Sequence, residues 1–310
     1  MQRPFSVEVW LTEQQIAAEF ESAFTHRFLD EKFFYWLPPS VQAWVDLTTS
    51  TEYRNSNRAL QVLKAEAGRV VELWPDAGSL CSLGCGEGSK DRVILEAFAE
   101  HGKLLDYVAT DFSQALLELA IANAVSVSGA QRGVKFDVFS DRQFGTLKQS
   151  GRPCIFAILG NTLGAFDPQK FPSRLRRLMR AEDRALFDGE IFAGESTLRG
   201  YDNPTNRRFA FGPLTAMGVT EEDGELMFEV RTGQNGLHEV AKYFEARRDI
   251  VVRFAGKVLK LSAGERVLMS SSVKYDEEAF YGFIRQGEFE IEHSAKSKDG
   301  HFMLAAVRAA

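Results

Sequence analysis

The sequence predicts an α/β protein built on a doubly wound, Rossmann-like parallel sheet, with a C-terminal antiparallel hairpin and a smaller accessory α+β region. Three observations predict this fold. Strand-like and helix-like segments alternate between residues 79 and 189, a glycine-rich turn follows the first strand, and beyond about residue 195 short strands are spaced for antiparallel pairing. The 310 residues, 45% of them hydrophobic, suffice for about two packed units.

The N-terminal part is predicted to be helical. Residues 9–36 are interpreted as helix ending in the aromatic run 33–36, after which Pro38-Pro39 is expected to stop any helix. Residues 52–73 carry apolar side chains at close to a 3.6-residue period, which predicts a second helix. The aromatic run has two interpretations, which are core packing and a lid over a substrate.

Five strands are predicted for the parallel sheet. They are 79–83, 105–110, 134–139, 153–159 and 184–189. Ser113 is expected to cap the helix that follows the second strand. The tail adds a helix at 276–286 and two strands, 289–293 and 302–307, joined by a Lys-Asp-Gly turn that favours a hairpin.

The accessory region is predicted from four further strands. They are 225–231, 239–245, 249–254 and 257–261. We therefore predict a sheet domain formed by residues 65–194 and 265–310, and an accessory domain formed by residues 1–64 and 195–264.

Composition excludes several classes of function. The chain has 43 acidic and 37 basic residues and a formal net charge of -6, so no nucleic acid is expected as its main partner. No apolar run approaches the roughly 20 residues that span a bilayer, and the first residues lack the apolar core of a signal peptide. Three cysteines cannot form a disulfide framework. We expect a cytoplasmic protein without a membrane partner.

Metal chemistry is not expected either. The five histidines form no HxH or HxxxH pair, and no CxxC is present. Cys81 and Cys85 lie in or beside an apolar strand, where small buried residues are the simpler interpretation.

The segment Gly84-Cys85-Gly86-Glu87-Gly88 joins the first strand to its helix and is the first candidate binding site. Ligands of doubly wound sheets bind outside the carboxyl ends of the strands, and glycines let the backbone approach a ligand closely. The GxGxG spacing, followed by Ser89-Lys90, fits an S-adenosylmethionine (SAM) loop better than the GxGxxG loop of nicotinamide enzymes. A purely structural turn is the alternative.

Polar residues at the ends of the next two strands extend this site. Asp111, with Phe112 beside it, ends the second strand about 25 residues after the loop, where a carboxylate can accept hydrogen bonds from both ribose hydroxyls of a nucleoside. Asp141 is expected to close the third strand and, with Arg142, to border adenine. The alternatives are a carboxylate at the start of the next helix for Asp111 and an ordinary surface turn for Asp141.

Small residues also follow the fourth strand, at 159–168. Gly160 and its neighbours suit a backbone that passes close to the sulfonium and the acceptor. Asn161 offers an amide that both donates and accepts hydrogen bonds. The alternative for Asn161 is a turn residue in the left-handed αL conformation.

Taken together, these segments resemble the histidine-specific methyltransferase family, which includes an enzyme that trimethylates the α-amino group of histidine. The resemblance covers most of the chain and implies a class I methyltransferase sheet with SAM as cofactor. The matching segments are 32–35, 52–53, 82–86 with Lys90, Asp111, 140–141, 159–164, 200–202, 238–243, 264–265 and 272–275.

The resemblance implies roles for the matching positions. The cofactor set is Gly84, Cys85, Gly86, Lys90, Asp111, Phe112, Asp141, Arg142 and Gly160. Within it, the glycines and the lysine would hold the methionine part, Asp111 the ribose, and the Asp141-Arg142 pair the adenine. The acceptor set is Tyr35, Tyr53, Asn161, Tyr201, Ser270 and Ser272.

Two positions depart from the family. The asparagine that holds the amino acid moiety of the substrate is replaced by Ala165, and the glutamate that accepts from the imidazole by Ser270, while a serine is retained as Ser272. Losing a buried carboxylate removes charge-assisted recognition worth about 1.5–3 kcal/mol. We infer that histidine itself is not the substrate.

We expect a SAM-dependent methyltransferase that acts on another amino acid or amino-acid-derived small molecule, preferably at nitrogen. The sequence leaves three alternatives open: carboxylate O-methylation, a catalytically silent SAM-binding module, and a nicotinamide-dependent oxidoreductase, which the GxGxG spacing disfavours. It leaves the oligomeric state open as well.

Overall fold

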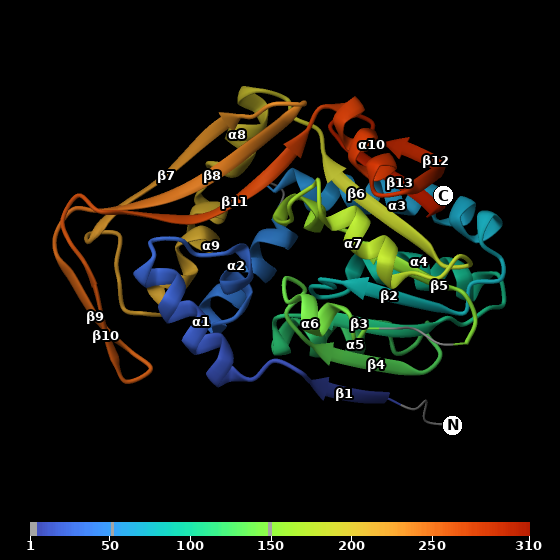
Figure 1. The fold of residues 1–310 in the computed structure, drawn as a ribbon, viewed down its shortest axis with the longest axis horizontal. Coiled ribbons are helices and arrows are strands. Elements are labelled where there is room, and N and C mark those ends of the chain that lie inside the picture. Colours follow the sequence, from blue (N-terminus) through green and yellow to red (C-terminus); the bar gives the residue numbers. More distant parts are fainter. Residues whose placement is uncertain (1–4, 51–52, 148–150) are drawn as a thin grey trace. The chain divides into compact units, whose positions relative to one another are not determined.

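The computed structural model describes residues 5–50, 53–147 and 151–310 and divides the chain into two compact units (Figure 1). Unit 1 comprises the chain up to Trp10, Asn55–Phe192 and Lys274–Ala310, and unit 2 comprises Leu11–Arg54 and Ala193–Val273. These divisions differ from the 64/65 and 264/265 divisions expected from the sequence. The reason is that the second predicted helix and an N-terminal strand at Phe5–Val9 belong to unit 1. Most of a long strand that begins at Arg266 belongs to unit 2.

Unit 1 is built on an eight-stranded sheet in the order β1-β4-β3-β2-β5-β6-β13-β12 (Figure 1). The strands are β1 (Phe5–Val9), β2 (Ser79–Leu83), β3 (Asp106–Asp111), β4 (Gln131–Lys135), β5 (Cys154–Ile158), β6 (Arg184–Glu190), β12 (Phe289–Lys296) and β13 (Phe302–Ala309). Strands β1 to β6 pair in parallel, and β13 and β12 add an antiparallel hairpin. The predicted doubly wound sheet with its C-terminal hairpin is confirmed.

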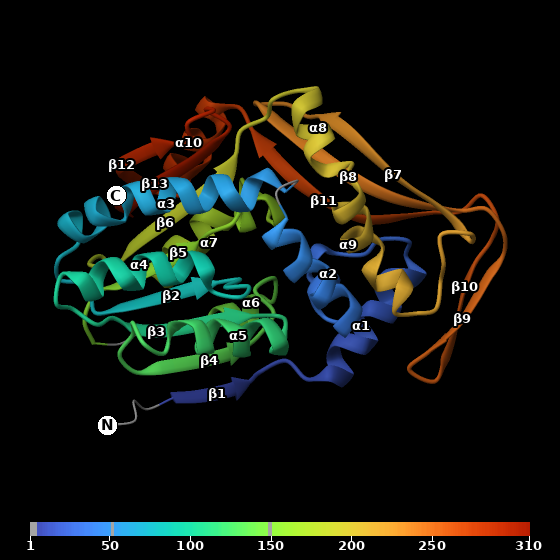
Figure 2. The same cartoon turned by 180° about the vertical axis from the view of Figure 1, so that it is seen from behind.

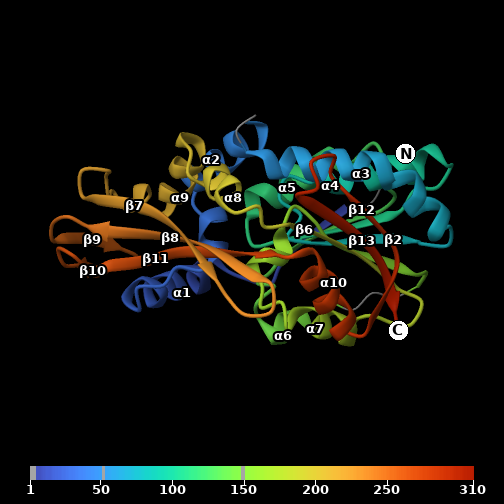
Figure 3. The same cartoon turned by 90° about the horizontal axis from the view of Figure 1, so that it is seen from above.

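Helices cover both faces of this sheet (Figures 2 and 3). One face carries α3 (Arg54–Leu73), α4 (Ser89–Glu100) and α5 (Gln114–Ala124); the other carries α6 (Asp141–Phe144), α7 (Phe171–Leu178) and α10 (Glu277–Gln286). On the first face, buried side chains such as Val70 of α3 and Phe98 of α4 pack in one core with Leu80 of β2. Because the parallel strands all run the same way, the loops after β2, β3, β4 and β5 leave the sheet at one edge.

Two predictions near the N-terminus are wrong. Residues 9–36 do not form one helix, because β1 is followed by α1 (Glu13–Thr25) and a separate 3-10 helix, η1 (Glu31–Tyr35). Pro38-Pro39 begins α2 (Pro38–Thr49) instead of ending a helix. Proline is tolerated there because the N–H groups of a helix's first turn have no partner within the helix, so the missing N–H of proline costs no hydrogen bond. The second predicted helix is α3, and its expected first residue, Glu52, lies outside the described residues.

The third predicted strand is displaced along the chain. It was expected at 134–139, whereas β4 spans Gln131–Lys135. A Cβ at Gly133 would lie 2.6 Å from Cδ1 of Ile121 on α5, so the strand approaches this helix closely. The prediction failed because the strand begins with Gln, Arg and Gly, whereas the apolar residues lie at its end and in the turn beyond it.

Unit 2 combines a three-stranded sheet, in the order β11-β8-β7, with the two-stranded hairpin β9–β10. Its elements, besides α1, η1 and α2, are α8 (Glu195–Tyr201), α9 (Pro204–Thr215), β7 (Gly224–Thr232), β8 (Leu237–Ala246), β9 (Ile250–Phe254), β10 (Lys257–Leu261) and β11 (Arg266–Tyr275). The antiparallel pairing of β7 with β8 and of β9 with β10 was expected, but β11 and the two helices were not. An ion pair between Arg27 and Glu265 (2.9 Å) joins the N-terminal segment to this unit.

In the part of the chain that the structure describes, no helix is both long and apolar enough to cross a membrane.

Candidate active site

The loop after β2 has a backbone conformation that only glycine adopts readily. Gly84, Gly86 and Gly88 have φ angles of 75°, 54° and 79°. A Cβ at Gly88 would lie 2.8 Å from Cα of Ala120, so the loop also packs tightly on α5. Its first two backbone N–H groups both donate to the carbonyl oxygen of Thr110 on β3, at 3.0 and 2.9 Å. The loop is therefore fixed at the carboxyl ends of β2 and β3.

Asp111 braces the same loop from the end of β3. Its Oδ2 accepts a hydrogen bond from the Gly86 N–H at 2.9 Å, and its Oδ1 accepts one from the Ser113 N–H at 2.8 Å. Burial raises the pKa of Asp111 to about 6, although both N–H donors favour the charged form. Ser113 caps α5 as predicted, so the helix-start interpretation of Asp111 applies. Each carboxylate oxygen has a second lone pair, and the predicted ribose contact stays a prediction.

The turn after β5 is held by a second buried carboxylate. Gly160 and Asn161 have φ angles of 81° and 63°, and their N–H groups donate to Oδ2 and Oδ1 of Asp188, both at 2.7 Å. The side-chain oxygen of Asn161 accepts the backbone N–H of Glu190 at 3.0 Å. Asn161 therefore is the αL turn residue of the alternative interpretation, and its contact with an acceptor stays a prediction.

These two loops lie against each other. A Cβ at Gly160 would be 2.9 Å from Cε of Lys90, and a Cβ at Gly84 would be 3.1 Å from Cγ2 of Thr162. Burial raises the pKa of Asp188 to about 7, an effect that the nearby charge of Lys90 opposes. The structure thus gathers the following members of the predicted cofactor set: Gly84, Cys85, Gly86, Lys90, Asp111, the adjoining Phe112, and Gly160.

The prediction on the adenine side needs a correction. Asp141 does not close β4; it begins α6, where its side chain is 92% exposed and pairs with Arg174 (Oδ1 to Nε, 2.9 Å). Arg142 follows it and is also exposed. The carboxylate nearest the strand end is Asp137, which is 5% exposed and accepts the N–H of Phe139 at 2.8 Å. Asp137 was not expected at the site because the predicted strand ended at residue 139, and the adenine contacts stay predictions.

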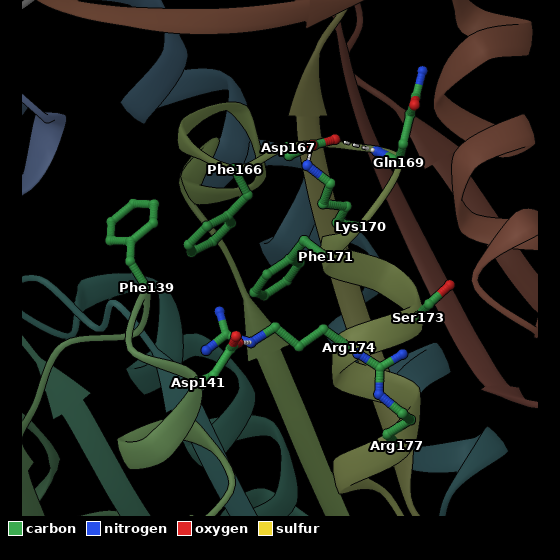
Figure 4. A pocket seen from close by; sticks show the side chains of 10 residues that line it. All are labelled: Phe139, Asp141, Phe166, Asp167, Gln169, Lys170, Phe171, Ser173, Arg174 and Arg177. Atoms are coloured by element: carbon green, nitrogen blue, oxygen red, sulfur yellow. Dashed lines mark hydrogen bonds and ion pairs between the residues drawn. The ribbon is translucent and has the colours of Figure 1, made fainter.

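A cleft of about 440 Å³ opens beside α6 and α7 (Figure 4). Its aromatic floor includes Phe166 and Phe171, which stack at 3.9 Å, and Phe139, which lies 5.0 Å from Phe166. The complete lining is Phe139, Asp141, Phe166, Asp167, Gln169, Lys170, Phe171, Ser173, Arg174 and Arg177. Of the predicted site residues, only Asp141 lies on this cleft.

In unit 2, two of the predicted acceptor tyrosines meet at Trp44. The rings of Tyr35 and Tyr53 lie edge-on to it at 5.1 and 6.1 Å, and Phe209 of α9 contacts both Tyr35 and Trp44 (5.5 and 5.3 Å). Nε1 of Trp44 is buried and has no hydrogen-bond partner among the described residues. The sequence analysis missed Trp44 and Phe209 because only the tyrosines matched the family.

The third tyrosine, Tyr201, faces a buried lysine of the same unit. Nζ of Lys242 lies 6.0 Å from the Tyr201 ring centre and 5.5 Å from that of Phe209. Lys242 is 1% exposed, and its Nζ is 3.7 Å from Oε1 of Glu31, which also accepts the Tyr35 hydroxyl at 3.3 Å. Oε2 of Glu31 is buried and has no hydrogen-bond partner in the described part of the chain. Glu31 and Lys242 are further members that sequence reasoning missed.

Ser270 and Ser272 lie on β11 and are buried. Ser270 has a φ of 114°, which is rare for a residue with a side chain. Its hydroxyl is buried, and no described residue forms a hydrogen bond with it. Among the described residues, the structure therefore has an unpaired hydroxyl at the position where the resemblance implies a carboxylate. The acceptor roles of Ser270 and Ser272 stay predictions.

Comparison with known proteins shows the family of the chain. The profile of a family described as "Histidine-specific methyltransferase, SAM-dependent" matches residues 12–205 and 228–309. Histidine N-alpha-methyltransferase of Mycobacterium tuberculosis is 24% identical over 82% of this chain and 82% of its own length. The N-methyltransferase imqF of Aspergillus flavus is 20% identical over 86% of this chain and 77% of its own.

Among solved structures, magnesium protoporphyrin IX methyltransferase of Synechocystis PCC 6803 is similar at 11% identity, with a TM-score of 0.48, 95% of this chain and 99% of that chain covered. The family profile and the two curated relatives give no support to the alternatives outside methyl transfer. Because the family profile spans most of the chain, both its N-terminal segment and its C-terminal hairpin, the protein belongs to the histidine-specific, SAM-dependent methyltransferase family, and its cofactor is SAM.

Proposed function

We propose that this protein transfers a methyl group from SAM to a nitrogen atom of an amino acid or amino-acid-derived small molecule other than histidine. The observation that carries the cofactor half is the glycine loop, whose three glycines are in left-handed conformations, with Gly86 held by Asp111 and Gly88 packed on α5. Only glycine leaves this backbone open to a ligand at such close range. The similarity to the two N-methyltransferases described above supports nitrogen rather than oxygen as the acceptor atom.

The residues of unit 1 suit the polar groups of SAM. Lys90 would hold the amino acid end, because its ammonium favours a carboxylate, and the glycine loop would let the backbone approach that end closely. Asp111 would accept from the ribose hydroxyls, and Phe112 with Asp137, or with Asp141 and Arg142, would border the adenine. When bound, SAM supplies a methyl group already activated by the sulfonium, so the protein has to align rather than to activate.

The residues of unit 2 suit an amine. The rings of Tyr35, Tyr53 and Trp44 form an aromatic wall, and aromatic faces attract cations. Nε1 of Trp44 is a buried donor and Oε2 of Glu31 a buried acceptor, both without a partner among the described residues. An amino acid carries the complementary pair of groups. Because an α-amine has a pKa near 8, a fraction of it is neutral at neutral pH, and no strong base is required.

The exclusion of histidine rests on Ser270. This hydroxyl replaces the carboxylate of the family, and a neutral hydroxyl gives an imidazole N–H a weaker partner than a carboxylate does. Ala165 likewise provides no amide for the substrate's amino acid group. The proposed acceptor is therefore an amino compound whose side chain carries no imidazole.

Two measurements test this function. Isothermal titration with SAM and with S-adenosylhomocysteine (SAH) should show binding to the intact protein and much weaker binding to Asp111→Ala; absence of binding to the intact protein would refute the proposal. A panel of amino acids, their amides and the matching amines, with histidine included, is then incubated with SAM and analysed by mass spectrometry. Methylation on a carboxylate, or histidine as the best acceptor, would contradict the proposed substrate class.

A further inference from the structure

Three of the four places where the chain passes between the units are tied to one buried carboxylate, Glu190 at the end of β6. Asn55 Nδ2 donates to Glu190 Oε2 at 2.7 Å, and Lys274 Nζ lies 3.2 Å from the same oxygen. Both residues stand directly at a crossing, and Glu190 itself stands two residues before a third. The crossings are Trp10/Leu11, Arg54/Asn55, Phe192/Ala193 and Val273/Lys274.

This cluster is buried and balanced in charge. Asn55, Glu190 and Lys274 are 5%, 3% and 0% exposed. Arg58, one turn further along α3, lies 3.9 Å from Oε1 of Glu190 and 2.6 Å from a carboxylate oxygen of Asp299. Two positive side chains, Lys274 and Arg58, therefore lie near the buried Glu190 carboxylate, and pairing of this kind makes a buried charge tolerable.

The cluster is also bonded to the turn after β5 that contacts Lys90. The backbone N–H of Glu190 donates to the side-chain oxygen of Asn161 at 3.0 Å. Tyr275, next to Lys274, donates its hydroxyl to the carbonyl of Leu163 at 3.4 Å. The carbonyl of Tyr275 in turn accepts the N–H of Phe192 at 2.9 Å. The crossing segments and the Gly160–Asn161 turn are thus parts of one bonded network within unit 1.

Stability alone does not account for such a cluster, because apolar side chains of the same volume stabilise a protein equally well or better than a buried ion pair does. What the charged groups add is direction, since each bond is made in one geometry only. We infer that Glu190 is a positioning residue, which holds the three connecting segments in one register with the Gly160–Asn161 turn. The effect of Glu190 on methyl transfer rests on the proposed function, whereas its positioning of the connecting segments does not.

Four variants separate positioning from charge balance. Glu190→Asp keeps the charge but shortens the side chain by one carbon, and Glu190→Gln leaves Lys274 without its counter-charge. The double variant Glu190→Gln/Lys274→Met removes both charges at nearly constant volume, so it should fold even where the single Gln variant does not. Asp183→Asn is the matched control, because Asp183 is a buried, ion-paired carboxylate just before β6, at the other end of the same strand.

Hydrogen exchange of the ligand-free protein gives the direct readout. In Glu190→Asp and in the double variant, amides of residues 190–193 and 273–276 and of the Gly160–Asn161 turn should exchange about tenfold faster or more, while those of α4 stay unchanged. Asp183→Asn should leave the crossing segments unchanged. Unchanged exchange at the crossing segments, either in Glu190→Asp or in the double variant, would overturn the inference.

Kinetics then tests the consequence for catalysis. We expect Glu190→Asp and the double variant to bind SAH within about threefold of the wild-type Kd. Both should lose at least about tenfold in kcat on whichever acceptor the panel identifies. Recovery of wild-type kcat by the double variant would show that only charge balance matters and would overturn the positioning role. If the wild type methylates nothing, the proposed function fails, but the exchange experiment still tests whether Glu190 positions the connecting segments.

Discussion

Two glycines flank α4 and offer a matched test of the glycine loop. Gly88 precedes the helix with a φ of 79°, and Gly102 follows it with a φ of 76°. Their backbone strain on substitution is therefore nearly the same. Their surroundings differ, because a Cβ at Gly88 would lie 2.8 Å from the backbone of Ala120, whereas a Cβ at Gly102 would meet nothing within 4 Å.

The expected cost of each substitution follows from these contacts. An alanine in the left-handed region costs about 1–2 kcal/mol, and this is the whole penalty for Gly102→Ala. Gly88→Ala adds an overlap with backbone that cannot rotate away, and overpacking of this kind costs about 1–3 kcal/mol more. The free energy of unfolding should thus fall by about 2–5 kcal/mol in Gly88→Ala.

Denaturant unfolding measures the two free energies, and titration with SAH measures the effect on the loop. Relief of the overlap must move the start of α4 away from α5, so Gly88→Ala should weaken SAH binding at least about tenfold, while Gly102→Ala leaves the Kd within about twofold. Equal losses of stability in the two variants, or equal SAH affinities, would refute the packing argument and with it the loop's role as a fixed cradle.

Three further predictions concern charge. Asp111→Ala should raise the Kd for SAH by at least about tenfold, since it removes both the loop brace and the proposed ribose acceptor; an unchanged Kd in calorimetry would contradict that role. Asp91 is buried on α4, where its carboxylate accepts the hydroxyls of Ser82 and Tyr107 at 2.9 and 2.6 Å. Burial raises the pKa of Asp91 and of Asp188 to about 7, so these groups add stability that is fully present below about pH 4 and is lost as pH rises through about 7. As pH rises from about 5 to about 8, the free energy of unfolding should therefore fall less in Asp91→Asn than in the wild type. Parallel pH profiles of the two proteins would refute this. Finally, the double variant Ala165→Asn/Ser270→Glu should gain binding of histidine, measured by calorimetry in the presence of SAH, whereas no gain would show that other residues exclude it.

The cofactor half of the molecule could largely be predicted from the sequence because it depends on local patterns. The strands at 79–83 and 184–189, the glycine turn and the cap at Ser113 each follow from neighbouring residues, and the structure has them in place. Where the local pattern misleads, the prediction fails. Apolar residues beyond β4 displaced that strand, and the same error hid Asp137.

The acceptor half could not be predicted in the same way. Phe209 contacts Tyr35 and Trp44 across more than 150 residues of sequence, and no periodicity reports such a contact. The same holds for Glu31 and Lys242, which pair across helix η1 and strand β8. Only the resemblance to the family pointed to Tyr35, Tyr53 and Tyr201, and it could not indicate side chains at positions where the family pattern is silent.

This difference between the halves has a consequence for how specificity is encoded. The cofactor loop is defined by backbone conformation, where Gly84, Gly86 and Gly160 tolerate no side chain without strain, so it resists change. The acceptor side is defined by side chains, and replacing one of them leaves the backbone in place. Ser270 illustrates this, because it carries only a small hydroxyl at a strained φ of 114°, where the resemblance implies a carboxylate. On the proposed function, a change of acceptor would therefore need only one or two side chains of unit 2, while the backbone of the glycine loop in unit 1 stays the same.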